Sequence, residues 1–156
     1  MPNHCHNRVT FYSANTHDVA KLKQIFEDEK CFGQIIPEPD WANTPLMSKD
    51  VQGLVYDRGK VGELPQYVED YAKRLVFKST GHADDRWYDW RVNNWDTKWD
   101  AYDVVVTDDD PDCTEIEFNT AWSPPEAICS ALREQYPDLS ISWFYDEPGC
   151  EIAGYL

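Results

Sequence analysis

The order of two hydrophobic periods along the chain constrains its fold more than any other feature. Residues 8–13 alternate apolar and polar side chains with the period of two that a half-buried strand requires. Over residues 16–29 the apolar residues recur at helical spacing, and Asn15 or Thr16 can cap that helix. The first part of the chain is therefore predicted to form a strand followed by a helix that packs on the sheet.

The period of two returns twice in the second half of the chain. Residues 102–107 and 114–120 both have the composition and alternation of strands. The residues between them, Asp108 to Asp112, are acidic and include Pro111, which disfavours continued strand pairing. The sequence therefore predicts a hairpin whose two strands are joined by an acidic turn.

In the second strand of this hairpin the alternation assigns side chains to two faces. Ile116 and Phe118 share one face, which we expect to lie in the core, and Glu115 and Glu117 share the other, which we expect to face water. The acidic turn and the acidic side of this strand are contiguous, so they are predicted to form one negatively charged surface.

A second helix and further strands complete the pattern. The segment from Ser123 to Glu126 has the form of a capping box with proline at the first helical position, and the helix is predicted to run to about Gln135. Residues 140–145 form a predicted strand, and residues 151–156 are a candidate for a last one. The resulting β-α-β-β-α-β order is that of a ferredoxin-like sandwich of the α+β class.

One long segment interrupts this order. Between the first helix and the second main strand we expect a helical insertion over about residues 38–88, in which residues 64–76 have the clearest helical spacing. The length of 156 residues suits one domain. Residues 1–156 are therefore interpreted as a single ferredoxin-like domain that carries this insertion.

The segment 87–102 contains four of the seven tryptophans. Such a segment can be a platform on which a ligand stacks, or part of a hydrophobic core. Each tryptophan buries on the order of 200 Å² and dominates the packing around it. The core interpretation is therefore favoured.

The net charge of −15 is concentrated in residues 81–156, which hold 4 Lys+Arg and 18 Asp+Glu. Such an excess repels nucleic acid and anionic membranes and attracts basic surfaces. It also keeps proteins soluble, so solvation alone is a competing explanation. No apolar run is long enough to span a membrane, and the N-terminus lacks the apolar core of a signal peptide, so a cytoplasmic location is expected.

Tests for enzyme and metal motifs leave no catalytic residue, cofactor or metal site to predict. Asp108, Asp110 and Asp112 imitate the start of an EF-hand loop, but Cys113 and Asn119 stand where that loop needs glycine and glutamate. A weaker Mg²⁺ or Ca²⁺ site at this turn remains an alternative.

The cysteines and histidines also lack the spacing of a metal site. His4, Cys5 and His6 are adjacent on an extended chain and therefore point alternately to opposite sides. The five cysteines are an odd number without C-x-x-C spacing, so reduced thiols are expected.

Three blocks of sequence, residues 1–7, 94–102 and 118–125, resemble the YubB ferredoxin-like domain family of phage and plasmid proteins. His4 stands where that family usually has tryptophan, and Asp96 where it usually has glycine. The resemblance implies the fold and a mobile-element origin. It implies no activity, cofactor or site residue, because fold alone does not supply function.

The sequence therefore favours a non-enzymatic, acidic interaction module of a phage or plasmid that works in the bacterial host cell. Its expected partner is a basic surface of a host protein, with nucleic-acid-binding proteins of restriction or CRISPR systems as the favoured class, whose channel the carboxylates occupy in place of phosphates. The alternative is a metal-dependent phosphoryl-transfer or hydrolytic enzyme that uses the carboxylates from Asp108 to Glu117. The predicted partner-binding residues are Asp108, Asp109, Asp110, Asp112, Glu115 and Glu117.

Overall fold

A computed structural model of the 156-residue chain describes residues 3–41 and 86–156. The chain divides into two compact units: Met1–Glu38 with Trp90–Leu156, and Pro39–Asp89. The insertion predicted over about residues 38–88 stays a prediction, and the helix expected over residues 64–76 lies outside the described residues.

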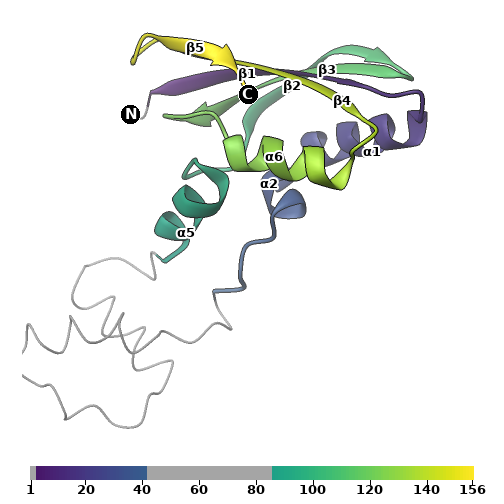
Figure 1. Ribbon diagram of the computed structural model, residues 1–156. Helices are drawn as coiled ribbons and strands as arrows, with labels where there is room; N and C mark the ends of the chain where they lie inside the picture. The colour runs from purple at the N-terminus through teal and green to yellow at the C-terminus, as the bar shows by residue number, and fades with distance from the viewer. Residues whose placement is uncertain (1–2, 42–85) are drawn as a thin grey trace, which may run out of the picture. The chain divides into compact units, whose positions relative to one another are not determined.

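A five-stranded antiparallel sheet forms the first unit. Its strands are β1 (His4–Tyr12), β2 (Tyr102–Asp110), β3 (Cys113–Ala121), β4 (Ser140–Glu147) and β5 (Ile152–Tyr155). They lie side by side in the order β2-β3-β1-β4-β5. Strands β1 to β4 reproduce the predicted ferredoxin-like arrangement, and β5 is added at the edge next to β4 (Figure 1).

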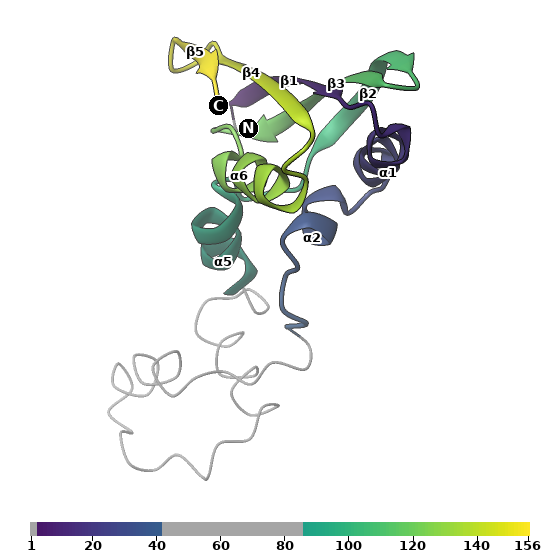
Figure 2. The same cartoon turned by 45° about the vertical axis from the view of Figure 1, so that its right-hand side comes forward.

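The helices α1 (Thr16–Glu27) and α6 (Glu126–Gln135) lie on the same side of the sheet (Figures 1 and 2). Asn15 caps α1 as predicted, since its side chain accepts a hydrogen bond from the His17 N–H at 3.2 Å. We call the opposite side of the sheet the open face, because neither helix covers it. Two further helices, α2 (Cys31–Ile35) and α5 (Arg86–Trp95), were not predicted.

The core lies between the sheet and these helices and is rich in aromatic rings. The Phe26 ring of α1 lies 5.5 Å from that of Phe11, 5.3 Å from that of Phe118 and 6.3 Å from that of Trp143. Both residues predicted to face inward from β3, Ile116 and Phe118, are buried. The alternation of β3 is therefore confirmed.

The predicted acidic turn from Asp108 to Asp112 is wrong in its extent. Strand β2 continues through Asp110, and the turn consists of Pro111 and Asp112. The ladder with β3 is kept to the end, although the register shifts twice along β2. Pro111 does disfavour pairing, but it stands beyond the last pair of the ladder, so it ends the strand later than expected.

The capping box predicted at Ser123 is also wrong. The N-cap of α6 is Pro125, whose side chain makes no capping hydrogen bond. The Ser123 hydroxyl donates instead to the backbone oxygen of Asp96. The carboxylate of Asp96 accepts a hydrogen bond from the Ala127 N–H at 2.8 Å, so a residue 31 positions away satisfies the first turn of α6.

The backbone at Asp96 is left-handed, with a φ of 62°. Glycine adopts this conformation without steric cost. Aspartate is one of the residues that tolerate it. Here it adds a carboxylate that caps a helix.

Candidate functional site

The register of the sheet decides which acidic side chains share the open face. In an antiparallel pair, residues directly opposite each other point to the same side of the sheet. Asp108 is opposite Glu115, and Asp110 is opposite Cys113. Because Cys113, Glu115 and Glu117 alternate with buried residues of β3, all of these side chains lie on the open face.

The six predicted partner-binding residues are therefore divided between different surfaces. Asp108, Asp110, Glu115 and Glu117 are brought together on the open face. Asp109 is opposite the buried Thr114 and lies on the helix side, where its Oδ2 atom is 2.6 Å from the Lys23 Nζ of α1. Asp112 lies in the turn, where its backbone oxygen accepts a hydrogen bond from the Ser13 N–H at 2.9 Å.

Two hydroxyl groups fix the carboxylate of Glu115. The Thr107 Oγ1 donates to its Oε1 at 2.9 Å, and the Thr10 Oγ1 donates to its Oε2 at 3.4 Å. Glu117, two residues further along β3, is exposed, and its side chain has no hydrogen bond or ion pair within the described residues. The open face thus contains one oriented carboxylate and one that is available to a partner.

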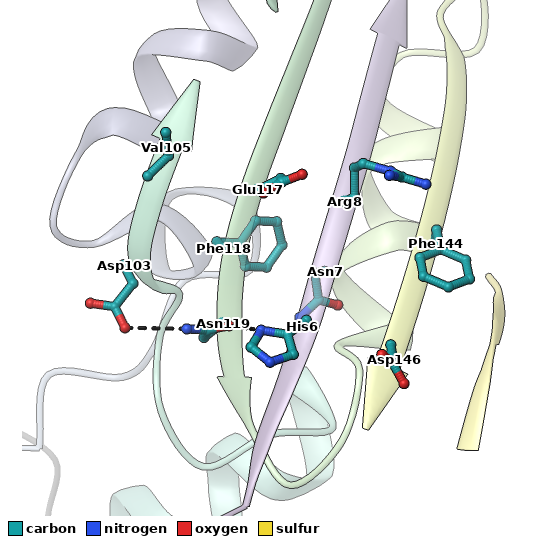
Figure 3. A pocket seen from close by; sticks show the side chains of 10 residues that line it. All are labelled: His6, Asn7, Arg8, Asp103, Val105, Glu117, Phe118, Asn119, Phe144 and Asp146. Atoms are coloured by element: carbon teal, nitrogen blue, oxygen red, sulfur yellow. Dashed lines mark hydrogen bonds between the residues drawn. The ribbon is translucent and has the colours of Figure 1, made fainter. Parts of the chain in front are cut away.

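A shallow hollow of about 340 Å³ lies in the open face and crosses four strands (Figure 3). A chain of hydrogen bonds runs along one side of it. The His6 Nδ1 is 2.6 Å from the Asn119 Oδ1, and the Asn119 Nδ2 donates to the Asp103 Oδ2 at 3.2 Å. The residues that line the hollow are His6, Asn7, Arg8, Asp103, Val105, Glu117, Phe118, Asn119, Phe144 and Asp146.

Sequence reasoning missed two of the acidic residues here. Asp103 has a φ of 53° and lies where the register of β2 is shifted, an irregularity that no period of two reveals. Asp146 lies in β4, whereas the predicted strand ended at Tyr145. A longer prediction of that strand would have placed Asp146 on the same face as Phe144, two residues before it.

The open face is acidic along its length. Within the described strands the single Lys or Arg is Arg8, which lies opposite Glu117 on one side and Phe144 on the other. The carboxylates on or beside this face are Asp103, Asp108, Asp110, Glu115, Glu117 and Asp146. Among the described residues, no three His, Cys, Asp or Glu side chains are grouped so that they could hold a metal ion.

The tryptophan-rich segment contributes mainly to the scaffold. Trp95 is buried, and its Nε1 donates to the Ile36 backbone oxygen at 3.0 Å. Thr97 donates to the Ala121 backbone oxygen at 3.0 Å. The prediction of a core role is therefore confirmed for Trp95, but Trp99 is 37% exposed.

Asp100 belongs to the same scaffold. Its carboxylate accepts hydrogen bonds from the N–H groups of Phe32 and Ala101 at 2.9 and 2.8 Å, and so holds α2 against the start of β2. Burial raises the pKa of this carboxyl above its usual range, although these hydrogen bonds act in the opposite direction. Its partners are internal, so we assign Asp100 a structural role.

The N-terminal histidines and cysteine point to opposite faces, as predicted. His4 and His6 are exposed and Cys5 is buried, and burial raises the pKa of the Cys5 thiol to about 11. The His4 Nδ1 is 2.6 Å from the Tyr102 hydroxyl. All five cysteines are free.

Similarity to known proteins agrees with this fold. Residues 94–156 match the family model described as the ferredoxin-like domain in Api92-like protein. The chain is also similar to the crystal structure of the protein api92 from Yersinia pseudotuberculosis, with a TM-score of 0.58 and 10% sequence identity over 99% of this chain and 93% of that chain. No curated protein matches the chain.

These likenesses contain no link to the YubB family or to phages and plasmids, so a mobile-element origin stays a prediction. Among the described residues, no helix is both long and apolar enough to cross a membrane. At 10% identity the likeness to api92 extends to the fold alone. Over residues 94–156 the chain contains a ferredoxin-like domain similar to that of Api92-like proteins.

Proposed function

We propose that this protein is a non-enzymatic interaction module whose open face binds a basic surface of another protein. One observation supports this proposal above the others: the register of β2 and β3 brings Asp108, Asp110, Glu115 and Glu117 to a face that α1 and α6 leave uncovered. The single Lys or Arg of the described strands cannot balance these charges. Complementary charge across an interface speeds association and selects the partner.

The spacing of the carboxylates suits an extended contact. Side chains on one face of a strand repeat about every 6.8 Å, and neighbouring strands lie about 4.8 Å apart. The acidic side chains follow β2 and β3 and therefore form a charged strip. A surface that normally binds the phosphates of a nucleic acid is a suitable partner, because it presents lysine and arginine along a path.

From this strip and the resemblance to phage and plasmid proteins, we propose that the natural partner is a nucleic-acid-binding protein of a bacterial defence system. The module acts in the cytoplasm of the host cell. It occupies the basic channel in place of DNA or RNA and so blocks restriction or CRISPR machinery. Direct binding of nucleic acid is disfavoured by the same charges.

The enzymatic alternative requires carboxylates that converge with a histidine or lysine in a cleft. Of the six residues predicted from the sequence, Glu117 alone lines the hollow that contains His6. Asp109 and Asp110 line a second hollow, of about 450 Å³, beside α1, but Lys23 is held there in an ion pair with Asp109. No three His, Cys, Asp or Glu side chains of the described residues are grouped so that they could hold a metal ion. The geometry thus favours a binding surface over a metal-dependent active site at Asp108 to Glu117.

The test compares two variants with the same net charge. The open-face variant carries Asp108→Asn, Asp110→Asn, Glu115→Gln and Glu117→Gln. The control variant carries Glu27→Gln, Glu29→Gln, Glu134→Gln and Asp138→Asn, all of which are exposed and lie in or directly after the helices α1 and α6.

Both variants and the wild type are immobilised and exposed to bacterial lysate, and a retained nucleic-acid-binding protein is purified. The proposal predicts that the wild type and the control variant displace duplex DNA or RNA from that protein and that the open-face variant does not. Equal displacement by both variants would show that the acidity serves solvation alone. A metal-dependent phosphodiesterase activity lost in the open-face variant would favour the enzyme.

A further inference from the structure

We infer that one row of the open face, formed by Glu117, Arg8, Phe144 and Tyr155, is a subsite for an arginine side chain of the partner. We call it the arginine row. This inference rests on the proposed function, because it assigns the chemistry of the basic residue that the open face receives. It predicts a preference for arginine over lysine, which net charge alone does not produce.

The register places these four residues side by side across four strands. Glu117 is opposite Arg8, Arg8 is opposite Phe144, and Phe144 is opposite Tyr155. The Phe144 and Tyr155 rings are 5.3 Å apart at an interplanar angle of 63°. Tyr155 is 70% exposed. The row thus has a carboxylate at one end and two rings in an edge-to-face pair at the other.

The conformation of Arg8 indicates what these rings bind. An arginine directly opposite a glutamate on an antiparallel pair is placed for an ion pair. Within the described residues, however, Arg8 forms no ion pair, and its Cζ lies 5.4 Å from the centre of the Phe144 ring. Figure 3 shows the Arg8 side chain directed toward β4 and away from Glu117.

The Phe144 ring therefore already binds a guanidinium group from its own chain, while Glu117 has no side-chain partner among the described residues. Asp146, which follows Phe144 by two residues, also lines the hollow and has no side-chain partner among the described residues. A second guanidinium group that enters the hollow reaches two carboxylates and an aromatic ring. Arg8 acts as an internal substitute for that group and competes with it for the ring.

Arginine fits this row better than lysine does. A guanidinium group is planar, stacks on aromatic rings and donates two parallel hydrogen bonds to a carboxylate. The lysine ammonium is a compact and strongly hydrated charge that lacks the planar fork. Both bring the same charge, so the rest of the open face attracts them equally.

The first experiment measures the affinity of the full-length protein for an oligoarginine and an oligolysine peptide of equal length at one salt concentration. We expect the arginine peptide to bind about 2- to 5-fold more tightly, the range of an exposed cation–π contact. Phe144→Leu is expected to remove this preference and to leave lysine binding unchanged. Because Phe144 is half-buried, Tyr155→Ser serves as a second variant whose side chain lies mostly in water, and its thermal unfolding is recorded as well.

The second experiment removes the internal competitor. Arg8→Ala is expected to raise the affinity for the arginine peptide about 2- to 5-fold and to raise that for the lysine peptide less. Lys23→Ala is the matched control, because it removes the same charge from the helix side, where Lys23 pairs with Asp109.

The outcomes separate the two claims. Equal binding of both peptides, with no effect of Phe144→Leu, would overturn the arginine row and leave the acidic open face intact. Equal gains from Arg8→Ala and Lys23→Ala would also overturn it, because net charge would then explain the change. Binding of neither peptide would overturn the proposed function and this inference with it.

Discussion

The two faces of the sheet are built from the same strands, but they serve different purposes. In β3, the residues that point toward the helices are buried, namely Thr114, Ile116, Phe118 and Thr120. The residues between them, Glu115, Glu117 and Asn119, are acidic or polar and point to the open face. The helices α1 and α6 do not cover that face (Figures 1 and 2). The difference shows that one face holds the fold together and that the other is free to carry charge.

The largest expected contrast concerns adjacent residues of β3. Phe118→Ala should lower the free energy of unfolding by about 3 to 5 kcal/mol, because it leaves a cavity among the Phe26, Phe32 and Trp143 rings. Glu117→Ala should lower it by less than about 1 kcal/mol. Urea unfolding of both variants measures the contrast. Equal losses would mean that the two faces are not distinct.

A second pair of substitutions compares the same amide side chain on the two faces. The buried Asn7 accepts from the Trp143 Nε1 at 3.0 Å and donates to the Thr120 Oγ1 at 3.0 Å. Asn7→Ala leaves the buried Trp143 N–H without its partner and should cost about 2 to 3 kcal/mol of unfolding free energy. Asn119→Ala on the open face should cost less than about 1 kcal/mol, because water replaces its partners. A larger loss for Asn119 would contradict the account.

A third prediction concerns pH and a buried carboxylate at the end of β4. A hydrogen bond from the Cys150 thiol, together with the N–H groups of Cys150 and Gly149, lowers the pKa of Glu147 below its usual value of 4.5, although burial opposes the shift. A carboxyl whose folded pKa is depressed stabilises the protein above its unfolded pKa and loses that contribution as the pH falls through the folded pKa.

Unfolding of the wild type should therefore need less urea as the pH falls below about 4.5, the region in which an unfolded glutamate takes up its proton. Glu147→Gln should be less stable than the wild type at neutral pH, and the difference between the two should shrink in acid. A difference that is constant with pH would show that the carboxylate is not stabilising in its ionised form.

The prediction with the smallest expected effect concerns the accessibility of the cysteine thiols in the folded protein. Cys150 is exposed and Cys113 is half-exposed on the open face, whereas Cys5, Cys31 and Cys129 are buried. A thiol reagent followed by mass spectrometry should label Cys150 and Cys113 in the folded protein, and the other three only after unfolding. Labelling of Cys5 in the folded protein would contradict its assignment to the buried face of β1.

The sequence predicts the covered face better than it predicts the open face. The alternation of Ile116 and Phe118 in β3 and the spacing of Val19 and Phe26 in α1 arise locally, so periodicity reveals them. The end of β2 is different, because Asp108 to Asp110 have low strand propensity and are held in the strand by the ladder with β3. The register of β2 against β3 decides that Asp108 and Asp110 lie on the open face and Asp109 on the helix side, and no local pattern contains that register.

Other features depend on contacts that no local pattern contains. The carboxylate of Asp96 caps a helix that begins 30 residues later, and Asp100 holds the five-residue helix α2. A helix that short has almost no period to detect. Asp103 enters the hollow through a bulge, which shifts the alternation that sequence reasoning relies on.

The most direct test of the acidic open face is a salt titration of the association rate with an oligolysine peptide. Exposed charges attract each other over about 8 Å at physiological ionic strength, so a charged strip should make association strongly dependent on salt. The wild type and the control variant should show the same steep decrease in rate as salt rises. The open-face variant, which has the same net charge as the control, should associate more slowly and respond less to salt. Identical titrations for the two variants would contradict the account, because the position of the carboxylates on the open face would then have no consequence.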